Sequence, residues 1–188
     1  MDIPGVNGYN LIGMCSQSGL NILVPRTEIK SAVERLASGI TADYRDRNPL
    51  LIGILKGSFI FLADLVRALD FPLEVDFVRL SSYGGATETS GNVKVVQGLS
   101  APVAGRDVLV VEDIIDTGTT TAFFLDYLKE QAPASVRLCA LTDKPSRRRT
   151  PVAIDYLGIT VPDRFLVGYG LDCDEQYRNL PDICCLEE

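Results

Sequence analysis

Three carboxylates stand at the end of an apolar run in residues 108–121, "VLVVEDIIDTGTTT". Glu112 and Asp113 interrupt the aliphatic residues of a predicted buried strand, and Asp116 follows in a turn rich in Thr and Gly. Burying a charged group is costly unless a cation, hydroxyl groups or partner side chains compensate it. A sugar phosphate bound with Mg²⁺ would supply both a cation and hydroxyl groups. The run therefore predicts an acidic site for an anionic ligand.

The turn after this strand has the composition of a phosphate site. Thr117, Thr119 and Thr120 offer hydroxyl donors, and Gly118 lacks the Cβ that would keep a ligand away. A helix that begins here would add free N–H groups and the positive end of its dipole. An ordinary capped helix would account for the same residues. The spacing matches neither a P-loop nor a dinucleotide-binding glycine motif.

Composition excludes several classes of function. The chain has 188 residues and no histidine, which excludes Ser-His-Asp and Cys-His catalysis and every imidazole metal site. Its net charge of −7 disfavours a broad basic face, so we expect no nucleic-acid partner. The one basic run, at residues 147–149, has two interpretations, a solvated turn and a local site for a small anion.

The sequence shows no targeting signal, and its cysteine spacing is typical of a cytoplasmic protein. The apolar runs are too short to span a membrane and the N-terminus does not resemble a signal peptide, so we expect a cytoplasmic location without a membrane partner. Five cysteines without a C-x-x-C pair predict reduced thiols rather than a disulfide framework or a zinc ribbon.

The three carboxylates must be positioned by the surrounding strands and helices. Buried apolar strands that alternate with helices predict an α/β fold, with a mainly parallel sheet and helices on both faces. Helices are expected at 25–39, with Thr27 as N-cap and Gly39 as the stop, and at 59–69 and 120–130. Ligands of such sheets bind at the carboxyl ends of the strands, where the acidic pair stands. Strands are expected at 49–55, 73–80, 93–98, 107–114, 135–144, 153–161 and 164–172.

Residues 81–92, "SSYGGATETSGN", contain no aliphatic side chain larger than alanine. Loops of this length in a compact domain are commonly functional lids or disordered segments. Composition alone leaves two interpretations open, a lid over a site and a solvated connector between two strands.

The run "VLVVEDIIDTGTT" closely resembles the phosphoribosyl pyrophosphate motif of type I phosphoribosyltransferases, in the form typical of the hypoxanthine-guanine branch. "LIGILKGSFIFLADLVRAL" resembles the pyrophosphate loop of that family, and "VRLSSYGG" resembles the start of its mobile loop. "DKPSRR" and "VPDRFLVGYGLDCDEQYRNLPDI" resemble its purine-binding segment, so the likeness extends over residues 24–185. It implies one domain over residues 1–188. The core would span about 24–161, and the N-terminal segment with 162–188 would form a small hood over the carboxyl ends of the strands.

The resemblance assigns roles to the opening motif. Glu112 and Asp113 match acids that lie against the ribose hydroxyls and Mg²⁺, and Asp116 matches the acid or base that serves N7 of the purine. The family often has "DTGKT" where this chain has Thr119, so one positive charge near the 5′-phosphate is absent. The other residues that the resemblance places on phosphoribosyl pyrophosphate are Thr117, Gly118, Thr120, Lys56, Gly57, Arg178, Ser82 and Tyr83.

The purine segment is matched in the same way. Lys144 matches a lysine that donates to the 6-oxo group, which suits an ammonium because it has donors and no acceptor. Phe165 resembles an aromatic that stacks on the base, and Leu166 offers backbone contacts beside it. Asp172, in the same segment, matches a second Mg²⁺ ligand. In the family a cis peptide precedes the lysine that matches Lys56.

The resemblance implies Mg²⁺-dependent transfer of a 5-phosphoribosyl group to N9 of hypoxanthine or guanine, with release of pyrophosphate. A lid at residues 81–92 would exclude water, which is the competing nucleophile. Two alternatives remain open, a xanthine-preferring transferase and a nucleotide-sensing regulator that binds RNA. Family members also suggest a homodimer or homotetramer.

Overall fold

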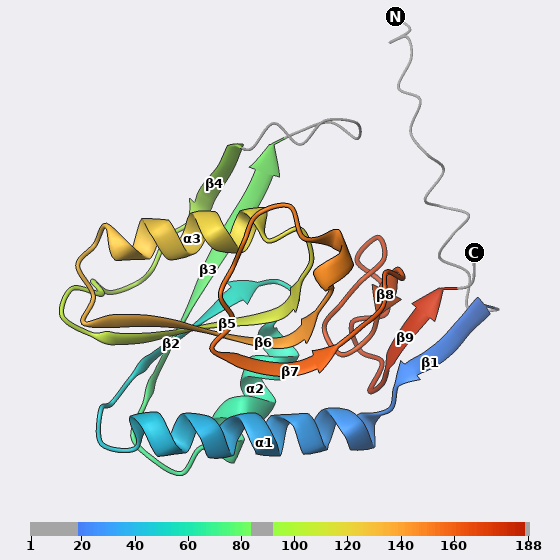
Figure 1. Cartoon of the computed structure of the whole chain (residues 1–188), viewed down its shortest axis with the longest axis horizontal. Helices are drawn as coiled ribbons and strands as arrows, with labels where there is room; N and C mark the ends of the chain where they lie inside the picture. The colour runs from blue at the N-terminus through green and yellow to red at the C-terminus, as the bar shows by residue number, and fades with distance from the viewer. Residues whose placement is uncertain (1–18, 84–91, 187–188) are drawn as a thin grey trace, which may run out of the picture.

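The computed structural model describes residues 19–83 and 92–186, whose main body is a six-stranded sheet (Figure 1). The strand order is β4-β3-β2-β5-β6-β7, and every neighbouring pair is parallel except β3 with the edge strand β4. This confirms the predicted mainly parallel sheet. The strands are β2 (Leu50–Leu55), β3 (Glu74–Tyr83), β4 (Asn92–Gln97), β5 (Asp107–Ile115), β6 (Ser135–Asp143) and β7 (Tyr156–Thr160).

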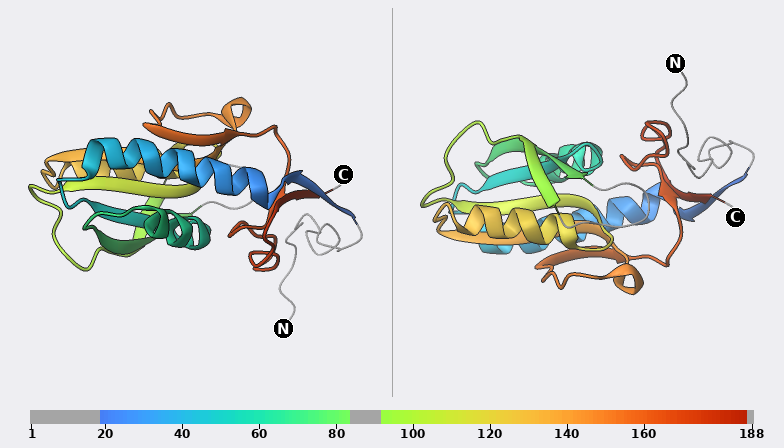
Figure 2. Two further views of the ribbon diagram at one scale, coloured as in Figure 1. Left: turned by 90° about the horizontal axis from the view of Figure 1, so that it is seen from below. Right: turned by 90° about the horizontal axis from the view of Figure 1, so that it is seen from above.

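Helices cover both faces of this sheet. α1 (Arg26–Tyr44) and α2 (Phe59–Ala68) lie on one face and α3 (Thr119–Lys129) lies on the other, as Figures 1 and 2 show. Successive residues of β5 alternate between the two cores. Leu109 packs in the core of α1 and α2, whereas Val110 packs with Phe124 of α3. Burial on both faces explains why the central strands read as continuous apolar runs.

A second, three-stranded antiparallel sheet lies beyond the carboxyl ends of the parallel strands (Figures 1 and 2). Its order is β1 (Leu20–Val24), β9 (Ile183–Leu186) and β8 (Leu166–Val167). The buried carboxylate of Asp182 accepts hydrogen bonds from Arg26 N at 2.7 Å and from Arg26 Nη2 at 3.0 Å. The first turn of α1 is thereby joined to the segment that leads into β9.

Several boundaries differ from the sequence predictions. α1 does not stop at Gly39 but continues to Tyr44, because Ile40 and Tyr44 extend its buried stripe. Thr27 is not the N-cap. The N-cap is Pro25, two residues earlier, and Asp182 accepts the hydrogen bond of the Arg26 amide.

The predicted strand at 164–172 is reduced to β8, because Gly168, Tyr169 and Gly170 all have positive φ and fold back in tight turns. Sequence patterns missed β1 and β9 entirely. The segment 81–92 is not all loop, since β3 continues through Tyr83 and β4 begins at Asn92. Its remainder, 84–91, lies outside the described residues, so the lid and connector interpretations both stay predictions.

Two further expectations can be compared with the structure. Cys139, Cys184 and Cys185 are free thiols as predicted, but the prediction is wrong for Cys173, which is disulfide-bonded. Among the described helices, none combines the length and the apolar character needed to cross a membrane.

Candidate active site

Strand β5 carries the acidic pair to the carboxyl edge of the sheet. Its register pairs Val111 with Gly53 of β2 and Glu112 with Ala140 of β6, so parallel neighbours flank both sides of the strand. The Glu112 and Asp113 side chains are almost fully buried, with 8% and 9% of their residue surfaces exposed. Thr142 of β6 donates a hydrogen bond of 2.8 Å to the carbonyl oxygen of Asp113, which fixes the backbone there. The predicted acidic site is therefore a rigid strand end.

Burial dominates the electrostatics of this pair. It raises the pKa of Glu112 well above its usual value, and the neighbouring charge of Asp113 raises it further. Burial also raises the pKa of Asp113 to about 6, against the opposing effect of nearby backbone N–H groups and Arg178. Glu112 Oε2 is buried and has no hydrogen-bond partner among the described residues. An acceptor in this state suits a hydroxyl group or a cation.

The loop after β2 closes tightly over Asp113. The Leu55–Lys56 peptide is cis, as the family resemblance implied. A Cβ on Gly57 would lie 1.9 Å from Oδ2 of Asp113, so only glycine fits without movement. From the other side, a Cβ on Gly170 would lie 2.1 Å from the Gly57 carbonyl oxygen. Gly57 is thus held between the acidic pair and the segment that follows β8.

The Thr/Gly turn leads into α3, and the amide of Thr119, the first residue of the helix, lies 3.5 Å from Thr117 Oγ1. Gly118 is the N-cap with a φ of 81°, and no side chain caps the helix. The expected alternative of a helix capped by Thr or Asp is therefore wrong. A Cβ on Gly118 would lie 2.4 Å from the Thr150 carbonyl oxygen.

A cavity of about 230 Å³ joins this turn to the acidic pair. Thr119 is not among the residues that line it, and its hydroxyl lies 3.2 Å from the Thr150 hydroxyl. The predicted residues that do line it are Gly57, Glu112, Asp113, Asp116, Thr117, Gly118 and Thr120.

A second cavity, of about 440 Å³, contains the residues matched to purine binding. Lys144, Phe165 and Leu166 line it together with Asp116. Lys144 is buried, whereas Phe165 keeps 45% of its surface exposed although it is a large apolar residue. Asp116 lines both this cavity and the 230 Å³ cavity. It is therefore placed where a group bound in one cavity could react with a group bound in the other.

Two cations predicted to contact pyrophosphate share one carboxylate. Lys56 Nζ lies 2.7 Å from Oε1 of Glu175, and Arg178 Nη2 lies 3.1 Å from Oε2 of the same residue. Arg178 Nη2 also lies 2.8 Å from Oδ1 of Asp172. Asp172 is not among the residues that line the purine cavity. The backbones of Ser82 and Tyr83 pair with Val93 and Asn92 across β3 and β4.

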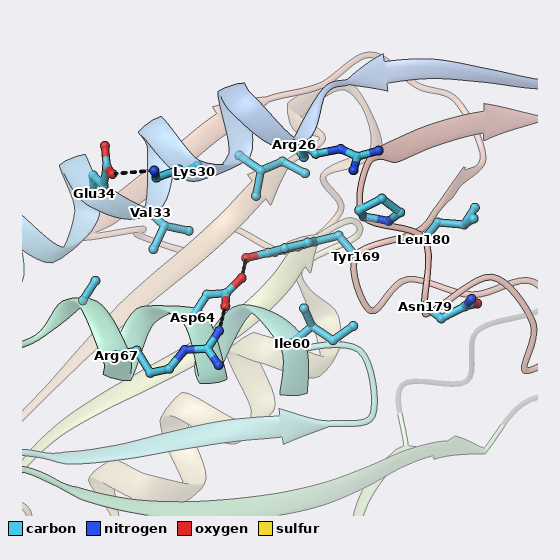
Figure 3. Close-up of a pocket in the computed structure, with 13 residues that line it drawn as sticks. Arg26, Lys30, Val33, Glu34, Ile60, Asp64, Arg67, Tyr169, Asn179 and Leu180 are labelled. Atoms are coloured by element: carbon cyan, nitrogen blue, oxygen red, sulfur yellow. Dashed lines mark hydrogen bonds and ion pairs between the residues drawn. The ribbon is translucent and has the colours of Figure 1, made fainter.

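A larger cavity, of about 620 Å³, lies between α1, α2 and the segment after β8 (Figure 3). Its lining is mainly apolar, and the Tyr169 hydroxyl donates to Asp64 at 2.5 Å across it (Figure 3). Arg67 and Lys30, which also line it, are already ion-paired with Asp64 and Glu34. None of the predicted site residues lines this cavity. A site chosen by cavity size alone would therefore differ from the two cavities that the predicted site residues line.

Sequence reasoning missed three charged residues of the site. Arg147 Nε lies 3.3 Å from Oδ1 of Asp116, and the part-buried Arg148 forms an ion pair with Asp143. The interpretation of residues 147–149 as a solvated turn is therefore wrong for Arg148, whose side chain is 18% exposed, whereas Arg147 remains exposed. Glu175 was the third. The parallel register of β5 and β6 could have indicated the first two, because it brings the segments that follow these strands to one edge.

Comparisons with known proteins agree with this geometry. Residues 22–174 match the phosphoribosyl transferase domain family. The chain is 44% identical over 166 residues to hypoxanthine-guanine phosphoribosyltransferase of Bacillus subtilis (strain 168), covering 88% of this chain and 92% of the relative. It is 47% identical over 167 residues to the protein of the same name from Streptococcus pneumoniae (strain ATCC BAA-255 / R6), covering 89% and 93%. By contrast, it spans 26% of the length of the bifunctional protein TilS/HprT of Listeria innocua, to which it is 46% identical.

Solved structures give the same result. A hypoxanthine phosphoribosyltransferase from Staphylococcus aureus superposes with a TM-score of 0.86 at 39% identity, covering 89% of this chain and 91% of that chain. A hypoxanthine-guanine phosphoribosyltransferase from Bacillus anthracis has a TM-score of 0.86 at 40% identity, covering 90% and 100%. The family match over residues 22–174 and these close relatives show that this chain belongs to the phosphoribosyl transferase domain family.

Proposed function

We propose that this protein acts in purine salvage. It transfers the 5-phosphoribosyl group of phosphoribosyl pyrophosphate to N9 of hypoxanthine, and of guanine, and gives IMP or GMP plus pyrophosphate. One observation carries the proposal: Asp116 lines both the cavity of the acidic pair and the cavity of Lys144 and Phe165. The names of the Bacillus subtilis and Streptococcus pneumoniae relatives support the choice of base.

The 230 Å³ cavity takes the sugar phosphate. The uncapped first turn of α3 and the hydroxyls of Thr117 and Thr120 bind the 5′-phosphate. Glu112 and Asp113 accept hydrogen bonds from the ribose hydroxyls. Lys56, Gly57 and Arg178 hold the pyrophosphate, and Ser82 with Tyr83 closes over it. Because Thr119 bonds to Thr150 and brings no charge, backbone N–H groups carry most of the 5′-phosphate affinity.

The donor set fits Mg²⁺ bound together with the substrate. No group of three or more His, Cys, Asp or Glu side chains in the described residues forms a metal cage. Mg²⁺ is commonly held by one or two carboxylates plus substrate phosphates, and the unpartnered Glu112 Oε2 with Asp113 supplies that number. Asp172 is the proposed second ligand, after it leaves Arg178. When bound, the ion would neutralise charge that develops on the departing pyrophosphate.

The 440 Å³ cavity takes the base. The exposed ring of Phe165 stacks on the purine, and the backbone of Leu166 contacts its edge. Lys144 donates to the 6-oxo group and so disfavours adenine, whose amino group is a donor. Asp116 exchanges a proton with N7 as N9 bonds to the anomeric carbon. Arg147 Nε, at 3.3 Å from Asp116 Oδ1, orients this carboxylate.

The test is incubation with phosphoribosyl pyrophosphate, Mg²⁺ and one base at a time, followed by chromatographic detection of nucleotide. We expect IMP and GMP to form, and AMP to be absent. The proposal would be overturned if none of the tested purines gave a nucleotide. Tight RNA binding in a gel shift at moderate salt would then support the alternative of a nucleotide-sensing regulator that binds RNA.

A xanthine-preferring transferase is the second candidate. A structure named hypoxanthine-guanine-xanthine phosphoribosyltransferase superposes with a TM-score of 0.83 at 38% identity, covering 92% of this chain and 100% of that chain. Competition between hypoxanthine, guanine and xanthine for a limiting amount of enzyme separates the two candidates. A higher kcat/KM for xanthine than for hypoxanthine would favour the xanthine-preferring transferase over the first candidate.

We also propose a cytoplasmic location, a homodimeric or homotetrameric assembly, and one domain over residues 1–188 with its core at about 24–161. In this division the N-terminal segment and residues 162–188 form the purine-binding hood. Light scattering coupled to size exclusion would give the subunit number. A single cooperative unfolding transition, seen by both calorimetry and circular dichroism, would support one domain.

A further inference from the structure

Glu175 occupies the position of an anion between two cations, Lys56 and Arg178. Its Oε1 lies 2.7 Å from Lys56 Nζ and its Oε2 lies 3.1 Å from Arg178 Nη2. Both oxygens of one carboxylate are thus used, one on each cation, as two phosphate oxygens would be. We propose that Glu175 is an internal counter-ion that competes with pyrophosphate, and with the pyrophosphate group of the substrate, for Lys56 and Arg178. The inference rests on the proposed function, which assigns these two cations to pyrophosphate.

The backbone of Lys56 and the guanidinium of Arg178 are placed by contacts that do not involve Glu175. Lys56 precedes Gly57, whose backbone lies between Asp113 and Gly170. Arg178 Nη1 donates to the Gly170 carbonyl oxygen at 2.7 Å, and the Gly170 amide donates to the Arg178 carbonyl oxygen at 3.0 Å. Arg178 Nε is buried without a hydrogen-bond partner among the described residues. The arginine therefore keeps donor capacity for a further anion after Glu175 leaves.

The backbone of Glu175 is held so that its carboxylate meets these cations. Its φ is 62°, in the left-handed region that non-glycine residues rarely adopt. Its amide donates to Asp172 Oδ2 at 2.9 Å, and Cys173 and Gln176 exchange backbone hydrogen bonds across the turn. Uncommon backbone conformations of this kind persist where surrounding contacts over-determine them, and they are concentrated at functional sites.

The exposure of the groups makes the carboxylate exchangeable. The Glu175 side chain is 62% exposed and that of Lys56 is 45% exposed, so the ion pair between them is weak and open to displacement. The Arg178 side chain is 18% exposed, but the carboxylate that it shares with Lys56 is open to solvent. A magnesium-bound pyrophosphate brings several phosphate oxygens and displaces one carboxylate readily. After transfer, return of Glu175 to both cations would favour pyrophosphate release. Glu175 is thus a positioning residue that sets affinity and release without touching the reacting atoms.

The test compares Glu175→Gln with the wild-type protein. Glutamine keeps the length and an acceptor oxygen but removes the charge. Calorimetric titration with magnesium pyrophosphate, without purine, should give a Kd roughly 3- to 10-fold lower in the variant, the range expected for loss of one or two exposed ion pairs. KM for phosphoribosyl pyrophosphate should fall by a similar factor and KM for hypoxanthine should stay constant. The dissociation rate of pyrophosphate should fall in stopped flow.

Asp174→Asn is the matched control, because it removes the same charge from the adjacent exposed residue of the turn. Its Kd for pyrophosphate should stay within about twofold of the wild-type value. Weaker or equal pyrophosphate binding in Glu175→Gln would overturn the inference, as would an equal gain in both variants. Failure of both proteins to bind pyrophosphate would overturn it too. Pyrophosphate binding with the expected shift, but without nucleotide formation, would overturn the proposed function and leave the inference standing.

Discussion

Asp116 differs from the acidic pair in its surroundings although all three acids come from one run. Glu112 and Asp113 are buried at the strand end, whereas Asp116 is part-exposed between two cavities and is ion-paired with Arg147. A buried carboxylate with an oxygen that lacks a partner among the described residues suits binding of a cation or a hydroxyl group. An accessible carboxylate that lies between the two cavities suits proton transfer. The environment therefore assigns two kinds of chemistry to neighbouring acids.

We expect Asp116→Asn to lower kcat for nucleotide formation by about 10² or more, the scale of lost acid-base help. The amide keeps the shape but cannot exchange a proton with N7. Steady-state assays with hypoxanthine measure the change. Asp126→Asn, which alters an exposed acid on α3, is the control and should retain wild-type kcat. An Asp116→Asn enzyme with wild-type kcat would remove Asp116 from the mechanism.

The raised pKa of Asp113 predicts an unusual pH dependence of stability in the absence of ligands. Its folded-state pKa of about 6 lies above the ordinary value of 3.8, so the folded state binds the proton more tightly than the unfolded state does. Its contribution is fully present below about pH 4 and is lost as pH rises through 6. Between pH 4.5 and 7.5 this should lower the free energy of unfolding by on the order of 1–3 kcal/mol.

Urea unfolding of wild type and Asp113→Asn over that pH range measures the effect. The variant should show a shallower loss of stability as pH rises, with the slope that remains coming from Glu112. Parallel pH profiles for the two proteins would contradict burial as the cause. Added Mg²⁺ and phosphoribosyl pyrophosphate should reduce the wild-type slope, because they bind the ionised form.

At the scale of elements, two turns at strand ends define the site. β2 ends in the loop of Gly57, and β5 ends in the turn of Gly118. Each glycine is required by a close approach, to the Asp113 carboxylate for Gly57 and to the Thr150 carbonyl for Gly118. The parallel pairing of β2 with β5 brings both turns to the same edge of the sheet. The two loops thus act as walls of one cavity.

We expect Gly57→Ala to raise KM for phosphoribosyl pyrophosphate by roughly tenfold or more while KM for hypoxanthine changes little. Its methyl group would meet Asp113 Oδ2 at 1.9 Å, so either the loop or the acid must move. Such overpacking typically costs about 1–3 kcal/mol of stability. Gly98→Ala is the control, since nothing lies within 4 Å of its Cβ position. Wild-type KM values in Gly57→Ala would show that the close contact is not needed for substrate binding.

Most elements of the sheet could be predicted from sequence, because strands buried on both faces appear as apolar runs. The three acids and the Thr/Gly turn also identified the carboxyl edge. The hood could not be predicted in this way. β1 and β9 are short and pair across a separation of more than 150 residues, and β8 is cut to two residues by positive-φ turns. Arg147 was missed because its partner Asp116 lies 31 residues away, and Glu175 because its partner Lys56 lies 119 residues away, so no local pattern links them.

The whole molecule depends on how the second sheet is joined to the main body. Asp182 precedes β9 and receives hydrogen bonds from the backbone and side chain of Arg26, the first residue of α1. These hydrogen bonds lower the pKa of Asp182 below its usual value. The favourable contribution of this carboxylate is therefore present above about pH 4 and is lost in more acidic solution.

We expect Asp182→Asn to lower Tm by about 3–8 °C, since a buried hydrogen-bonded charge contributes roughly 1.5–3 kcal/mol. The purine cavity should loosen with it, because Phe165 and Leu166 belong to the joined segment. Calorimetry measures Tm, and steady-state rates over a range of hypoxanthine concentrations measure KM for the base. Asp70→Asn, which breaks an exposed pair with Arg45, should change Tm by about 1 °C or less. Equal Tm shifts in the two variants would mean that the contact between Asp182 and Arg26 contributes no more to stability than a surface ion pair does.

The contact of Gly57 with Gly170 has a consequence for mutational tolerance. Position 57 lies in the loop after β2 and position 170 in the segment after β8, and a Cβ at either would lie about 2 Å from another atom. A substitution at one glycine cannot be compensated at the other, because both are already the smallest residue. In a saturation-mutagenesis screen, these two positions should tolerate as few replacements as Asp116 does, although neither carries a reactive group.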